Sequence, residues 1–72
     1  MTNEEKIEIL AEAMDVEPED LHVEDELKNN DAWDSLSMLS LMAIVAQKCS
    51  KKISPQEIQG IVTVQDALNV IG

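Results

Sequence analysis

The chain has 72 residues, of which 44% are hydrophobic, and a formal net charge of −10 at pH 7. It is long enough for one folded domain, residues 1–72, and its content of Ile, Leu and Val argues against intrinsic disorder. A domain of this size buries too little surface to enclose a substrate together with catalytic groups, so we do not expect an enzyme.

Cysteine content, apolar runs and charge argue against several further kinds of site and partner. Cys49 is the single cysteine, and no Cys/His cluster is present, so we expect neither a disulfide nor a metal site. The N-terminus lacks the pattern of a signal peptide and the apolar runs are too short to cross a membrane, which predicts a cytoplasmic protein without membrane contact. Because the chain is acidic and has no arginine, we expect protein partners with basic surfaces rather than nucleic acid.

The negative charge is concentrated in the first half of the chain. Residues 1–34 hold 13 of the 15 Asp and Glu residues, whereas residues 35–72 are nearly neutral. Such a run forms either a solvated surface or a docking site. Repulsion among these carboxylates should raise their pKa values in the folded state, so modest acidification or divalent salt should stabilise the fold.

The first predicted helix begins after Thr2 and ends near Met14. Thr2 and Glu5 have the spacing of a capping box, and the apolar residues that follow recur at helical intervals. Residues 15–34 lose this period and form a long connection, which is usually functional or contains short helical turns. The expected apolar anchors in this connection are Val16, Leu21, Val23, Leu27 and Trp33.

The second predicted helix begins at Ser35, with Asp34 as its N-cap. One apolar stripe should face the core: Met38, Leu41, Met42, Val45 and Cys49. A second stripe lies on an adjoining face: Leu36, Leu39, Ala43 and Ala46. The side expected to face water holds Ser37, Ser40, Ile44 and Gln47. Two apolar stripes indicate either a central helix contacted on several sides or a surface for a partner beside Ser35.

Two shorter helices are predicted in the last third of the chain. Ser54, Pro55 and Glu57 form a helix start, and Gly60 ends that helix. The last helix begins after Thr63 and buries Val64, Ala67, Leu68 and Ile71. Residues 61–64 have no second strand with which to pair. The predicted fold is therefore all-α, a small four-helix bundle of three main helices and one short helix, with a long acidic loop between helices 1 and 2.

Signatures of catalysis and of calcium binding are weak. Asp34, Ser35 and His22 contain the residue types of a catalytic triad, but a lone loop histidine in so small a domain does not predict one. The acidic loop lacks the glycine and glutamate positions of an EF-hand. We therefore predict no catalytic residue.

The residues Trp33-Asp34-Ser35-Leu36, where the long loop meets the second helix, resemble the prosthetic-group attachment motif of acyl carrier proteins. The resemblance extends over essentially the whole chain, including Ile53-Ser54-Pro55 and the closing segment from Ile61 to Ala67. It implies that Ser35, flanked by Asp34 and Leu36, carries 4′-phosphopantetheine through a phosphodiester. A phosphopantetheinyl transferase would supply this group from coenzyme A. The start of a helix is a favourable place for such an anion.

The resemblance also implies a carrier function. The arm would hold acyl groups as thioesters for an acyl-loading ligase or acyltransferase and for pathway enzymes, which would dock on Leu36, Leu39 and Ala43 of a monomeric carrier. The second helix lacks the glutamates of common fatty-acid carriers, which predicts a specialised fatty-acid, lipid or secondary-metabolite pathway. A short acyl chain would find shelter between the helices. An aminoacyl or peptidyl carrier and an unmodified helical interaction module remain as alternatives.

Overall fold

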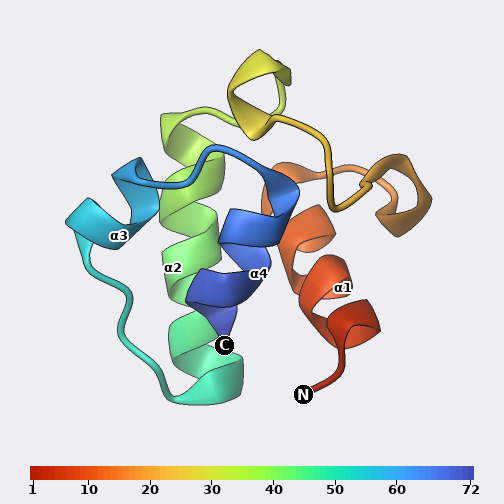
Figure 1. Ribbon diagram of the computed structural model, residues 1–72. Helices are drawn as coiled ribbons and strands as arrows, with labels where there is room; N and C mark the ends of the chain where they lie inside the picture. Colours follow the sequence, from red (N-terminus) through yellow and green to blue (C-terminus); the bar gives the residue numbers. More distant parts are fainter.

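The computed structural model describes residues 1–72 as four α-helices and two 3₁₀ turns. The helices are α1 (Asn3–Met14), α2 (Ser35–Cys49), α3 (Pro55–Gln59) and α4 (Val64–Ile71), and the turns η1 (Pro18–Asp20) and η2 (Leu27–Asn29) lie between α1 and α2. Figure 1 shows the long α1–α2 connection passing over the end of the bundle at which α2 begins, whereas both termini lie at the opposite end. The all-α class and the short helical turns in the connection are confirmed.

All four helices begin with a capping box, in which the N-cap side chain and the residue three positions later bond to each other's backbone amides. The N-caps are Thr2, Asp34, Ser54 and Thr63, at the predicted positions. Gly60 caps the end of α3 as predicted, although with ordinary right-handed backbone angles. The starts of the helices therefore follow from interactions between residues three positions apart.

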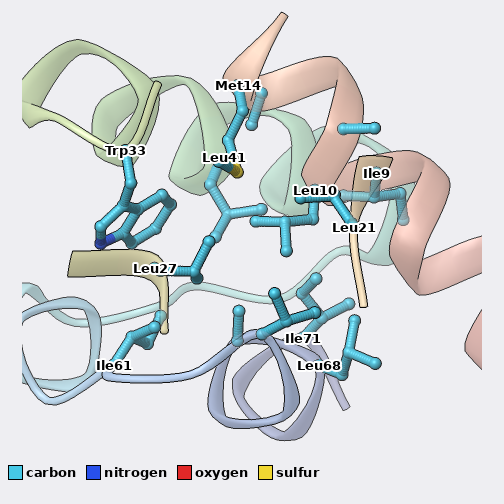
Figure 2. Packing of buried hydrophobic residues seen from close by; sticks show 14 of the residues in the cluster. Ile9, Leu10, Met14, Leu21, Leu27, Trp33, Leu41, Ile61, Leu68 and Ile71 are labelled. Carbon is cyan, nitrogen blue, oxygen red and sulfur yellow. The ribbon is translucent and has the colours of Figure 1, made fainter. Parts of the chain in front are cut away.

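The core lies between α1, α2 and α4. Figure 2 shows side chains from these three helices converging, with Leu27 and Trp33 of the α1–α2 connection at one edge. The side chains of Leu10, Leu41 and Val45 are fully buried. The predicted stripe of α4 is confirmed, because Val64, Ala67, Leu68 and Ile71 are all at most 2% exposed.

The long connection is fixed to the segment before α4 by backbone hydrogen bonds. The Leu27 amide donates to the Val62 carbonyl at 2.7 Å, and the Val64 amide donates to the Asp25 carbonyl at 2.9 Å. No strand forms at residues 61–64, as predicted, and the contact is a single isolated bridge. These bonds hold the connection over the core.

Four of the five predicted anchors in the connection contact the core. Leu21, Leu27 and Trp33 are buried, and Val16 is partly buried against the same cluster. The prediction is wrong for Val23, which is 38% exposed. Its backbone carbonyl, not its side chain, fixes this position by accepting a hydrogen bond from the Gln65 amide at 3.1 Å.

The burial of side chains on α2 agrees with the prediction except on the side expected to face water. Leu41 and Val45 face the core, and Met38, Met42 and Cys49 are half-buried at its edge. The side predicted to face water is wrong for three residues, because Ser37 is buried and Ser40 and Ile44 are half-buried. This side lies toward α1, as the ion pair between Lys48 and Glu12 of α1 at 3.3 Å shows. Gln47 is exposed as predicted.

Candidate functional site

Ser35 is the first residue of α2, and the backbone on both sides of it is fixed by one capping box. The Asp34 carboxylate accepts a hydrogen bond from the Ser37 amide at 2.9 Å. In return, the Ser37 hydroxyl accepts from the Asp34 amide at 2.8 Å and donates to the Asp34 carbonyl at 2.9 Å. The buried Ser37 and the N-cap therefore hold Ser35 in place between them.

The side chain of Ser35 itself is exposed, and its hydroxyl makes no hydrogen bond within the protein. The amides of Ser35 and Leu36, in the first turn of α2, also have no partner within the protein. Unpaired amides and the positive end of the helix dipole favour an anion at this position. The arrangement suits a serine that receives a negatively charged group.

The Ser35 hydroxyl makes no hydrogen bond to a histidine or a carboxylate. Figure 1 shows the segment around η1, just before His22, at the edge of the molecule on the far side of α1 from α2. The backbone amide of His22 donates to the carboxylate of Asp25, within the same connection. The structure therefore does not assemble His22, Asp34 and Ser35 into a triad. No group of three or more His, Cys, Asp and Glu side chains is arranged to hold a metal ion.

An open groove of about 300 Å³ begins at Ser35. Met38, Leu39 and Met42 of α2 form one wall, and Pro55, Ile58 and Gln59 of α3 form the other. Its lining is mostly apolar, and of the lining residues only Ile58 is buried. The groove is therefore a surface feature. Sequence analysis did not find it, because no local pattern indicates that α3 lies beside this part of α2.

The face of α2 next to Ser35 exposes large apolar side chains. Leu36 is 73% exposed and Leu39 is 64% exposed, and Ala43 follows on the same face. The other leucines of the protein, by contrast, are at most 5% exposed. The predicted docking residues thus lie on one accessible surface beside Ser35.

Two carboxyl groups show how capping affects titration. Hydrogen bonds from Thr2, first from its backbone amide and then from its side chain, lower the pKa of Glu5. Backbone hydrogen bonds from Thr63 and Val62 lower the pKa of Asp66. For Glu5 the expected rise in pKa is wrong, because hydrogen bonds to the ionised form outweigh the desolvation that would raise it. Asp66 lies outside the acidic first half of the chain, to which that expectation applied.

None of the helices is both long enough and apolar enough to span a bilayer.

A family model described as the phosphopantetheine attachment site matches residues 7–71, which include Ser35 and all of α2. A comparison with curated proteins found no match.

Proposed function

We propose that this chain, which belongs to the phosphopantetheine attachment site family, is an acyl carrier protein that bears its prosthetic group on Ser35. The family carries 4′-phosphopantetheine covalently, so the chain is a phosphopantetheine-carrying carrier protein. The observation that carries the assignment to Ser35 is its exposed, unpaired hydroxyl at the start of α2, within the matched region.

The residues around Ser35 fit such a group. A phosphodiester on the hydroxyl would lie beside the unpaired amides of Ser35 and Leu36, and this position near the helix dipole is worth about 0.3–1 kcal/mol. The Asp34 carboxylate is occupied with the Ser37 amide, so the two anions would use different donors. When bound, the arm supplies a terminal thiol on which acyl groups travel as thioesters.

The protein's own residues then act by presentation rather than by catalysis. Leu36, Leu39 and Ala43 form the apolar surface on which an enzyme docks beside Ser35. Docking raises the effective concentration of the tethered substrate at the active site of that enzyme. Carboxylates of α1 and of the α1–α2 connection attract basic partner surfaces and thereby raise the association rate. The phosphopantetheinyl transferase, a loading ligase or acyltransferase, and pathway enzymes are the partners in this proposal.

The groove beside Ser35 supports an acyl rather than an aminoacyl cargo. Its walls are mainly Met38, Leu39, Met42 and Ile58, and no charged side chain lines it. A short acyl chain would bury apolar surface there, whereas an ammonium group would lose hydration without a partner. An aminoacyl or peptidyl carrier remains the alternative use of the same arm.

The pathway is proposed to be a specialised fatty-acid, lipid or secondary-metabolite route. Residues 35–47 of α2 contain no ionisable side chain, so partners that recognise glutamates on this helix would find none. A monomeric carrier is proposed, because two chains with a charge of −10 each repel one another. A cytoplasmic location, where the single Cys49 stays reduced, completes the proposal.

Intact-protein mass after incubation with coenzyme A and a broad-specificity phosphopantetheinyl transferase tests the function and the site together. We expect one phosphopantetheinyl group on the wild type and on Ser40→Ala, a matched serine of the same helix, and none on Ser35→Ala. A folded wild type that gains no mass would refute the carrier proposal and leave an unmodified interaction module. Addition to Ser35→Ala would refute the site.

A further inference from the structure

The apolar surface of α2 extends beyond the residues predicted for docking. Leu36, Leu39, Ala43 and Ala46 are all exposed and follow one another at helical spacing on one face. We call these four residues the α2 stripe. Ala46, the last residue of the stripe, lines a shallow hollow together with Ser50, Lys51 and Lys52. The stripe therefore runs from the attachment serine at one end to a pair of lysines at the other.

The two ends of the α2 stripe carry opposite charges. Asp31 and Asp34 are exposed beside Ser35. At the far end, the ammonium group of Lys51 donates to the Val70 carbonyl at 2.7 Å and is half-buried. Lys52 is exposed and makes no ion pair or side-chain hydrogen bond. Lys52 is thus the cation available to a partner at this end.

The overall charge limits what can cover the α2 stripe. A second copy of the chain would bring together two net charges of −10, and nucleic acid or an anionic lipid surface would be repelled in the same way. A partner protein remains, with an apolar patch facing the uncharged residues 35–47.

Apolar contacts define the direction in which a partner binds only through side-chain size, because the two leucines of the α2 stripe lie at the Ser35 end and the two alanines at the other. The spacing of the four residues, three, four and three, is the same read from either end. The arm, however, leaves only from the Ser35 end, so a partner bound in reverse would be unproductive. Opposite charges at the two ends strengthen the preference for the productive direction, because a reversed complex would place like charges together.

We propose that Lys52 is a specificity-determining residue that orients partner enzymes on α2. The partner's docking surface is apolar in the middle, basic where it receives Ser35 and acidic where it meets Lys52. This inference rests on the proposed function, and the phosphopantetheinyl transferase is the partner to which it commits, because that enzyme must reach Ser35.

The test is the kcat/KM for phosphopantetheinylation by a broad-specificity transferase at low ionic strength, measured by intact mass. Lys52→Glu should lower kcat/KM roughly tenfold, and Lys52→Ala should give an intermediate value. The matched control is Lys6→Glu on α1, which changes the net charge equally and should stay within about twofold of the wild type. Added salt should reduce the effect at Lys52.

The outcomes separate this inference from the function on which it rests. If the wild type is modified and Lys52→Glu reacts as fast or faster, as a uniformly basic partner would require, the orienting role of Lys52 is refuted. Equal losses in Lys52→Glu and Lys6→Glu would assign the effect to net charge and also refute it. A wild type that is not modified at all contradicts the carrier function instead.

Discussion

The Ser37→Ala substitution removes the buried hydroxyl that completes the capping box at the start of α2. Ser37 is 4% exposed, and its hydroxyl bonds to both the amide and the carbonyl of Asp34, at 2.8 and 2.9 Å. Without it the Asp34 amide loses its partner, whereas the Asp34 carboxylate still accepts from the amide of residue 37. Loss of a cap costs about 0.5–2 kcal/mol. Because the orphaned amide is partly buried, we expect the upper part of this range, about 1–2 kcal/mol.

Urea unfolding followed by the fluorescence of Trp33, the single aromatic residue, measures this loss. Ser40→Ala is the matched control, since Ser40 is half-buried on the same helix, its hydroxyl makes no hydrogen bond, and alanine favours helix. In thermal melts, each kcal/mol corresponds to roughly 4–8 °C for a domain of this size. If Ser37→Ala and Ser40→Ala agree within about 0.5 kcal/mol, the capping box does not hold the start of α2 as argued.

Two further predictions concern the connection and the start of α4. Trp33→Ala should lower the free energy of unfolding by about 3–5 kcal/mol, because a buried indole is removed; circular dichroism during urea unfolding measures it, and a loss below about 1 kcal/mol would contradict the packing. Asp66→Asn should destabilise the fold at neutral pH, since hydrogen bonds from Thr63 and Val62 lower the pKa of this carboxyl. A group with a lowered folded-state pKa stabilises the fold above its unfolded pKa and loses that contribution as pH falls through the folded value. The difference between wild type and Asp66→Asn should therefore shrink below about pH 4, and a pH-independent difference would count against this linkage.

The helices could be predicted from the sequence because their determinants are local. An N-cap and its partner lie three residues apart, and an apolar stripe repeats every three or four residues, so Thr2, Asp34, Ser54 and Thr63 each marked a helix start. The helix start at Ser35 was found in this way, whereas its role as the attachment residue came from the resemblance of Trp33-Asp34-Ser35-Leu36 to the motif of acyl carrier proteins. The turns in the connection were expected for a different reason, the length of the connection itself.

The orientation of α2 was not predictable in full, because it depends on neighbours that are distant in sequence. Its two apolar stripes are nearly equal in hydrophobicity, and only the position of α1 decides that Ile44 is half-buried while Leu36 is exposed. The burial of Ser37 also has a local cause in the sequence, although its polarity led us to place it on the side that faces water. A serine three residues after an N-cap can bond to the backbone of that cap, and its hydroxyl is then satisfied without water.

The exposed leucines of α2 separate the requirements of folding from those of binding. Full burial of a leucine contributes about 1.5–3 kcal/mol, and Leu10, Leu27, Leu41 and Leu68, each at most 1% exposed, provide this to the fold. Leu36 and Leu39 cannot do so at 73% and 64% exposure. Folding therefore does not require leucine at these two positions, whereas a partner that docks beside Ser35 gains most from large apolar groups there. For the same reason, this face of α2 can change to suit different partners while the core that presents Ser35 stays the same.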